Sequence, residues 1–183
     1  MNREEALALL HEHTKSENLR KHAYAVEAAM RYFAHLFNED EEKWAVTGLL
    51  HDFDYEEHPT PEEHPITGVK ILESMNVSQD IILAIKGHAD YLGIPRDTLM
   101  AKSLYAIDEL TGFVMAVALV RPSKKLADVS VSSVKKKMKD KAFARNVNRD
   151  EIIKGASELN MELDALIEYV IVALQGIAGR LGL

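Results

Sequence analysis

Apolar residues recur at helical spacing along almost the whole chain, whereas the alternation that predicts a β-strand is scarce. Residues 129–134 do alternate, but serines fill the polar positions and no second strand is available to pair with them. The pattern therefore predicts an all-α fold. With bounds taken from caps and helix breakers, the predicted helices span 3–13, 17–37, 39–50, 61–75, 79–88 and 98–120, and two or three more follow Pro122.

Short polar signals mark where these helices begin. Asn2 and Ser16 can cap the first two helices, and Asn38 with Glu41 three residues later predicts a capping box at the start of the third. The run 60–63 (Thr-Pro-Glu-Glu) combines an N-cap, a proline at the first helical position and a glutamate at the third. We therefore expect the fourth helix to begin at residue 61.

Composition and charge narrow the class of protein. Of 183 residues, 47% are hydrophobic and 28% are charged, as in ordinary globular proteins, and no internal repeat or Gly/Ser linker divides the chain. The net charge of −7 gives no general electrostatic reason to bind nucleic acid or an anionic membrane, so we expect a small-molecule or protein partner. The acidic start at 1–5 does not resemble a secretion signal, and we expect a cytoplasmic protein.

The chain contains no cysteine, which excludes a disulfide framework, a thiolate nucleophile and an iron–sulfur cluster. Any metal must therefore be bound by histidine and carboxylate side chains. All eight histidines lie in the first half of the chain, which makes that half the place to look for such ligands: His11, His13, His22, His35, His51, His58, His64 and His88.

Helical phase separates the inward histidines from the exposed ones. His22 falls on the apolar stripe of the helix 17–37, whereas His35 lies roughly 140° away around the same helix and is expected to be solvated. The same test, applied to the later helices, places four more residues inward: His51, His64, His88 and Asp108. Asp52 is adjacent to His51.

One inward histidine is most often a core residue whose hydrogen bonds are satisfied. Four of them beside inward carboxylates require nearby charge or hydrogen bonds that offset the loss of water. A carboxylate removed from water costs several kcal/mol unless a cation or hydrogen bonds offset the loss. A divalent metal supplies that charge directly. Histidine and carboxylate ligands without thiolate suit Mn, Fe, Co, Ni or Zn, and suit Mg less well because Mg prefers oxygen ligands.

His22, the doublet His51-Asp52 and Asp108 occur in the order His…His-Asp…Asp. This order resembles the signature of the HD-domain superfamily, whose members are mostly metal-dependent phosphohydrolases with an all-α fold. The resemblance covers residues 19–112. More loosely it covers 120–143, which is similar to the tail of small single-domain bacterial HD proteins described as predicted hydrolases. It implies one HD-type domain over 1–183, a helical bundle with its ligand core at about 17–112 and C-terminal helices at about 123–183 packing on it.

Two further elements match HD subfamilies that bind two or more metals, namely the run 64–68 (His-Pro-Ile-Thr-Gly) and the pair Gly87-His88. The resemblance implies one divalent ion held by four residues and a second held by Asp52, as a bridge, with His64 and His88. In the alternative interpretation, His64 and His88 only line the substrate cleft above a single ion. The residues implied for the first ion are His22, His51, Asp52 and Asp108.

The resemblance also implies a reaction, in which a metal-activated water hydrolyses a small phosphorylated metabolite or nucleotide. Two other functions remain open: an HD-fold di-iron oxygenase, which uses the same six ligands, and a binding module that keeps its metal without turnover. Phe53-Asp54-Tyr55 follows the doublet where cyclic-dinucleotide phosphodiesterases of this superfamily carry Gly-Lys, which argues against cyclic dinucleotides.

Candidate catalytic residues are Asp52, as the bridging ligand, and Asp54, which could relay a proton to the leaving group. Glu56 and Glu57 are candidates for the same relay, although the exposed acids of such a loop are usually solvated.

Candidate substrate-binding residues are Arg20 and Lys86, which are close in sequence to His22 and His88, together with His58. Neighbours on a helix face directions about 100° or more apart, which weakens the case for both cations. The basic run 135–141 is a further candidate for contacting phosphate, although such runs usually form a solvated face. The glycines at 176, 179 and 182 predict close helix packing or a contact in a homodimer.

Overall fold

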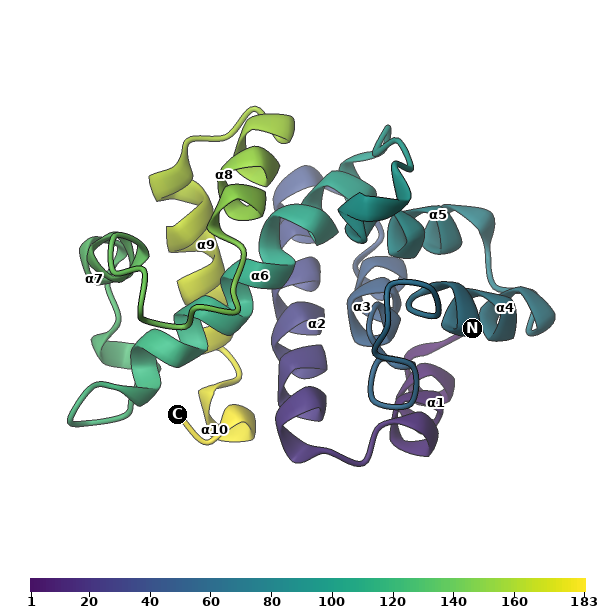
Figure 1. Ribbon diagram of the computed structural model, residues 1–183, viewed down its shortest axis with the longest axis horizontal. Helices are drawn as coiled ribbons and strands as arrows, with labels where there is room; N and C mark the ends of the chain where they lie inside the picture. The colour runs from purple at the N-terminus through teal and green to yellow at the C-terminus, as the bar shows by residue number, and fades with distance from the viewer.

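The computed structural model describes all 183 residues and contains helices without any strand, which confirms the all-α prediction (Figure 1). None of these helices combines the length and the apolar character needed to cross a membrane. Short 3₁₀ turns occur at Asp90–Leu92 and Leu126–Asp128. The α-helices are α1 (Arg3–His13), α2 (Glu17–Phe37), α3 (Glu41–Leu50), α4 (Ile66–Ser74), α5 (Gln79–His88), α6 (Leu99–Leu119), α7 (Val131–Met138), α8 (Arg149–Glu158), α9 (Leu163–Gln175) and α10 (Ala178–Leu181).

The predicted bounds of α1, α2, α5 and α6 are correct to within one residue. Asn2 forms the capping box of α1, because its side chain accepts a hydrogen bond from the backbone of Glu5 and the Glu5 carboxylate accepts one from the backbone of Asn2. Thr98 caps α6 through the backbone N–H of Ala101. Local capping chemistry therefore decides these helix ends.

Two predicted helix starts are wrong. Asn38 does not open α3; it ends α2 in the left-handed conformation, with φ 56°, which asparagine tolerates, and Asp40 caps α3 instead. The fourth helix begins at Ile66 instead of residue 61. Pro65 has no N–H to continue a helical ladder through this segment and disfavours helical backbone at His64, so residues 61–65 form turns. After Pro122 there are four helices where two or three were expected.

The two long helices α2 and α6, with 21 residues each, form the centre of the fold. Helices α1, α3, α4 and α5 lie to one side of α2 and α7–α9 to the other, while α6 crosses between them (Figure 1). A single hydrophobic core contains residues from α1 through α10, so the C-terminal helices pack on the same core as the helices that carry the candidate ligands. α6 is buried on most of its faces because apolar residues surround it almost completely.

Arg96 connects the end of α5 to α6 and α8. Its guanidinium donates to Glu158 at 2.6 and 2.7 Å, to the carbonyl of Gly87 at 2.8 Å and to Asp90 at 3.0 Å. The same group lies over the ring of Tyr105, 3.6 Å from its centroid. Because only 7% of the Arg96 side chain is exposed, these bonds replace water that the guanidinium has lost.

Replacing Glu158 by glutamine is expected to lower the free energy of unfolding at pH 7 by about 1–2 kcal/mol, because it weakens a charge-assisted hydrogen bond to a buried cation. The bond from Arg96 lowers the pKa of Glu158 from its ordinary 4.5, so this stabilisation is present above about pH 4.5 and is lost as the pH falls through the lowered pKa. Urea unfolding of the two proteins from pH 7 to acid pH measures the difference, which should close at the acid end. The matched control is Glu168→Gln at an exposed position of α9, and an undiminished difference at acid pH would contradict the prediction.

Candidate metal centre

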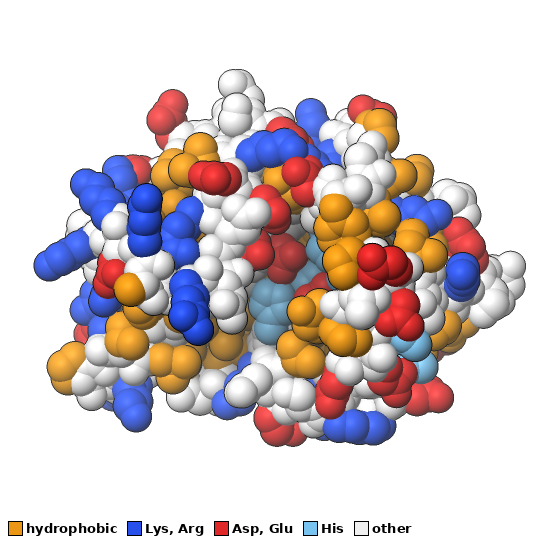
Figure 2. All heavy atoms as spheres, viewed as in Figure 1, with side chains coloured by type: hydrophobic (Ala, Val, Ile, Leu, Met, Phe, Trp, Pro, Cys, Tyr) orange, Lys and Arg blue, Asp and Glu red, His pale blue; other side chains and the backbone are white.

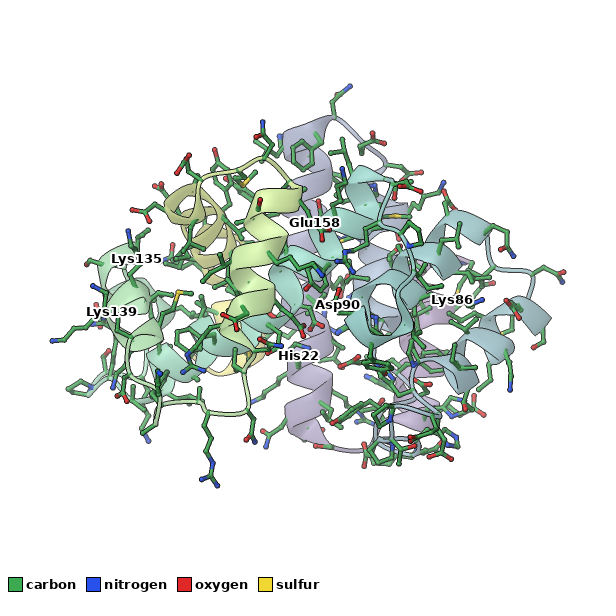
Figure 3. The ribbon with its side chains drawn as sticks, turned by 45° about the horizontal axis from the view of Figure 1, so that its top comes forward. His22, Lys86, Asp90, Lys135, Lys139 and Glu158 are labelled. Carbon is green, nitrogen blue, oxygen red and sulfur yellow. The ribbon has the colours of Figure 1, made fainter.

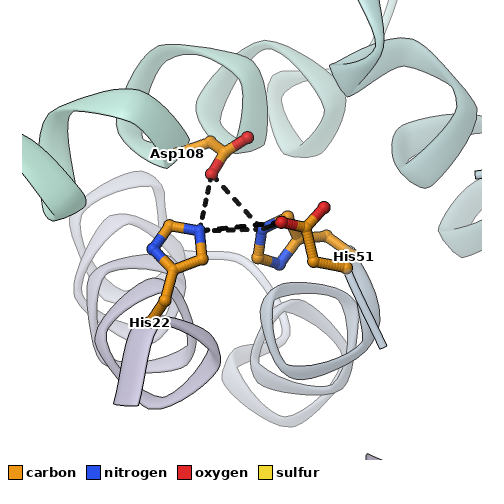
Figure 4. A group of neighbouring side chains, drawn as sticks. His22, His51 and Asp108 are labelled. Atoms are coloured by element: carbon orange, nitrogen blue, oxygen red, sulfur yellow. Dashed lines mark hydrogen bonds and ion pairs between the residues drawn. The ribbon is translucent and has the colours of Figure 1, made fainter. Parts of the chain in front are cut away.

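Three helices and the turn after α3 bring the first group of candidate ligands together (Figure 4). His22 projects from α2, His51 ends α3, Asp52 follows it, and Asp108 lies in the middle of α6. The Nε2 atom of His22 lies 2.9 Å from Oδ1 of Asp108 and 3.3 Å from Nε2 of His51. Nε2 of His51 lies 3.3 Å from Oδ1 of Asp108 and 3.4 Å from Oδ2 of Asp52.

A second group lies on the other side of Asp52. His64, just before α4, and His88, the last residue of α5, place their Nε2 atoms 3.3 Å apart. Each Nε2 lies 3.2 Å from Oδ1 of Asp52. The two oxygens of one carboxylate therefore face two different groups of ligands. The structure thus brings all six predicted ligands together.

The orientation of the imidazoles fits a cation. Nδ1 of His51 donates to the carbonyl of Gly48 at 2.8 Å, and Nδ1 of His88 donates to the carbonyl of Ile85. A neutral imidazole that donates from Nδ1 presents an unprotonated Nε2. Here that atom faces another Nε2 and carboxylate oxygens at 3.2–3.4 Å, and lone pairs at this distance repel unless a proton or a metal ion lies between them.

Charge within the cluster leads to the same conclusion. Burial on its own lowers the pKa of His51, but the carboxylates of Asp52 and Asp108 raise it to about 9. The pKa of His64 is likewise lowered by burial and raised by Asp52 and Asp54, to about 9. Burial raises the pKa of the Asp108 carboxyl, yet His51 and His22 hold it well below its usual range. The carboxylates stay ionised and need nearby positive charge, which protons or a divalent ion can supply.

Distances within the two groups are compatible with metal ligation. Metal–ligand bonds of about 2.0–2.2 Å put neighbouring ligand atoms about 3.0–3.5 Å apart. Neighbouring atoms of the first group are mostly 2.9–3.4 Å apart, with one pair, His22 and Asp52, at 3.9 Å. Those of the second group are 3.2–3.3 Å apart. The cluster could therefore bind divalent metal ions through an all-histidine and carboxylate set.

An open cleft of about 420 Å³ lies over both groups. Figure 2 shows the pale blue histidines at the floor of this hollow and red acidic side chains around it. Five of the six candidate ligands line the cleft, whereas His51 is fully buried beneath it. A small molecule that enters the cleft would therefore meet the cluster directly.

Asp54 lies behind the cluster and does not line the cleft. It is 1% exposed, and its carboxylate accepts hydrogen bonds from Nδ1 of His64 at 2.8 Å and from the backbone of Gly68 at 2.7 Å. Glu56 accepts from the backbone of Lys15 and Ser16, and so holds the loop against the start of α2. In this position Asp54 orients an imidazole instead of facing a leaving group.

Glu57, the remaining candidate for the relay, pairs with His13 at 2.8 Å and does not line the cleft. His58 is partly exposed beside Glu63 and is also absent from the lining. His35 is 83% exposed, which confirms that it is solvated.

The predicted cations also lie outside the cleft lining. Arg20 donates to the backbone carbonyls of Thr14 and His11, and Lys86 pairs with Glu73 at 3.5 Å. In Figure 3, Lys86 lies to one side of His22, and the basic helix α7, which carries Lys135 and is followed directly by Lys139, lies to the other.

Sequence reasoning missed the acidic and aromatic walls of the cleft. These side chains come from the segment after α3, the turn after α5, and helices α6 and α8: Tyr55, Asp90, Tyr91, Glu109 and Glu151. The position of Glu109 next to Asp108 was the one available signal. Glu151 could not be recognised as a lining residue without knowing how α8 packs on α6.

The fold and the cluster define a class of protein: an all-α protein in which side chains from several helices form a buried histidine–aspartate centre able to bind divalent ions. The family model described as HD domain matches residues 19–112, just over half of the chain, and the chain belongs to the HD domain family. This membership indicates a function of the metal-dependent hydrolase type. No curated protein and no solved structure matches the chain.

Asp54→Asn is expected to weaken divalent-ion binding at the second group by about 10–100-fold and to leave the first group unaffected. The amide cannot accept from both His64 and Gly68 at once, because one of its two terminal atoms is a donor. Calorimetric titration of the metal-free protein with Mn²⁺ or Co²⁺ measures both affinities. The control is Asp128→Asn at an exposed carboxylate without an ion pair, and two unchanged affinities in Asp54→Asn would contradict the expectation.

Proposed function

We propose that this protein is a metal-dependent phosphohydrolase acting on a small phosphorylated metabolite or nucleotide. The observation that carries the proposal is the position of Asp52, whose two oxygens face separate ligand groups beneath one cleft. His22, His51, Asp52 and Asp108 would hold one divalent ion, and Asp52, His64 and His88 a second. Divalent ions held at such a site supply the positive charge that activates water and stabilises phosphoryl oxygens.

The chain itself contributes orientation. The carbonyls of Gly48 and Ile85 and the carboxylate of Asp54 hold the Nδ1 atoms of three histidines, so that each Nε2 points into the cluster. His22 differs from these three, because its contact with Asp108 across the α2–α6 interface is made by Nε2, the candidate ligand atom itself, at 2.9 Å. These groups are fixed by buried helices, so the site requires little reorganisation when a substrate binds.

The proposed reaction is hydrolysis of a phosphate ester. A water oxygen forms a bond to phosphorus, the ester P–O bond breaks, and the departing oxygen takes up a proton, which gives an alcohol and inorganic phosphate. No side chain needs to become covalently attached to the phosphoryl group. The absence of cysteine and the location of four of the eight histidines within the cluster agree with this scheme.

The test uses the full chain, stripped with a chelator and reloaded separately with Mn, Fe, Co, Ni, Zn or Mg. We expect bound metal to approach two ions per chain and at least one metal to support phosphate release from an aryl phosphate. His35→Ala, which removes an exposed histidine, serves as the matched control and should behave as wild type.

Two other outcomes would replace this proposal. Two bound irons with a mixed-valence EPR signal and no phosphate release would favour the di-iron oxygenase. Bound metal and thermal stabilisation by metabolites, with no product under any metal, would favour a binding module.

A further inference from the structure

The cleft over the cluster is lined by acidic side chains and by no lysine or arginine. Apart from the candidate ligands, its acids are Asp90, Glu109 and Glu151, and the rings of Tyr55 and Tyr91 also contribute to the lining. Figure 2 shows red acidic side chains around the pale blue histidines. A phosphate ester is itself negatively charged and would be repelled by these acids. A different, positively charged part of the substrate would account for their presence in the cleft.

Asp90 is neutralised within the protein. Its carboxylate accepts from Lys154 at 2.7 and 2.9 Å and from Arg96 at 3.0 Å. Figure 3 shows Asp90 between Glu158 and His22, at the edge of the network around Arg96. Both nearby cations are therefore engaged, and neither is free to bind a phosphate in the cleft.

Glu109 and Glu151 form no ion pair. Glu109 projects from α6 beside Asp108, and Glu151, in the first turn of α8, accepts one hydrogen bond from the side chain of Asn148 at 2.6 Å. Both side chains are half-buried, so each carboxylate has lost part of its water without gaining a cation in exchange. A half-buried carboxylate without a cation is costly, and a positively charged ligand would relieve that cost.

The charges of the site indicate which ligand fits. Two divalent ions beside Asp52 and Asp108 would leave two positive charges unmatched, which is the charge of a phosphate monoester dianion with the opposite sign. A longer phosphate chain would bring more negative charge against Glu109 and Glu151, whereas an ammonium group between them would offset part of their charge. The aromatic rings of the lining add further attraction for an ammonium group.

We propose that Glu109 and Glu151 bind an amine of the substrate, so that the site selects small phosphate monoesters carrying an ammonium group over uncharged esters and polyphosphates. This inference rests on the proposed phosphohydrolase function and names the substrate class of the same site. The volume of the cleft, about 420 Å³, is sufficient for a molecule of this size.

The experiment compares matched esters on the full, metal-loaded chain. 2-Aminoethyl phosphate and propyl phosphate differ in one group: the first carries an ammonium where the second carries a methyl group of the same size. We expect kcat/KM for the amine to exceed that for the propyl ester by about 10–100-fold and to exceed that for ATP by at least as much. In Glu151→Gln and Glu109→Gln the preference should fall to about threefold or less. Glu168→Gln, on the exposed face of α9, should keep the full preference.

A binding measurement complements the rates. 3-Aminopropylphosphonate and butylphosphonate form the same kind of matched pair and cannot be hydrolysed as esters. Calorimetry should show the amine binding at least about tenfold more tightly to wild type, with the difference lost in Glu151→Gln. The metal content of each variant is measured in parallel, so that loss of an ion is not mistaken for loss of the amine contact.

The outcomes separate the inference from the proposal on which it rests. Equal rates and affinities within each pair, or a preference for ATP, would overturn the amine site while leaving the phosphohydrolase intact. An amine preference that persists in both glutamine variants would overturn the assignment to Glu109 and Glu151. Failure to hydrolyse any phosphate ester, the aryl phosphate included, would overturn the proposed function and this inference together.

Discussion

Asp52→Ala is expected to remove divalent ions from both ligand groups and to lower phosphate-ester hydrolysis by at least about a thousandfold, equivalent to about 4 kcal/mol of transition-state stabilisation. The reason is that Oδ1 and Oδ2 of this one carboxylate face different groups of histidines. Without it, the first group retains two histidines and Asp108, and the second retains two histidines with no carboxylate. Elemental analysis of the dialysed protein and phosphate release measure the two effects.

His88→Ala provides the comparison that makes this result specific. It removes a ligand from the second group alone, so bound metal should fall from about two ions per chain to about one. Far-UV circular dichroism should show the wild-type helical content in both variants, because the apolar core that holds the helices together does not depend on the ligands. If Asp52→Ala retained one tightly bound ion, the shared role of this carboxylate would be wrong.

The inward positions of His22, His51, His88 and Asp108 were accessible from the sequence because each lies on, or at the end of, a helix with apolar residues at helical spacing. Asp52 and His64 lie in turns, so His64 is buried as predicted although the helix used to place it begins only at Ile66. His22 lies on the apolar stripe of α2, and Asp108 lies on α6, which is apolar on most of its faces, so both residues are expected to face inward. His51 and His88 end their helices and share this phase. The resemblance to the HD superfamily then indicated which inward residues form one site. Periodicity alone does not establish that grouping.

Properties that depend on contacts between distant segments were not accessible. Arg20 and Lys86 were candidates through closeness in sequence, yet each is engaged elsewhere, with backbone carbonyls and with Glu73. The role of Asp54 depends on the path of the turns at 61–65, which bring His64 back onto it. The wall formed by Glu151 exists only because α8 packs against α6, an arrangement that no local pattern encodes.

That packing rests on Gly155, and Gly155→Ala is expected to lower the free energy of unfolding by about 2–3 kcal/mol. A Cβ at this position would lie 2.4 Å from Cα and 2.8 Å from Cβ of Ala106 on α6. Because the obstructing atoms belong to the backbone and to a short side chain, no rotamer change can relieve the overlap, so α8 has to move away. The higher helix propensity of alanine returns only about 1 kcal/mol. Thermal unfolding should show a Tm lowered by roughly 4–12 °C.

The same displacement makes the variant a test of how the cleft is built. All candidate ligands come from the chain before α8, so bound metal should stay at the wild-type level, whereas Glu151 moves with α8 and the preference for amine-bearing esters should weaken. Gly179→Ala is the matched control, since a Cβ there meets no atom within 4 Å and stability should change little. A Gly155→Ala protein with wild-type Tm would mean that α6 and α8 can separate at no cost. The position of the acidic wall would then not be set by this contact.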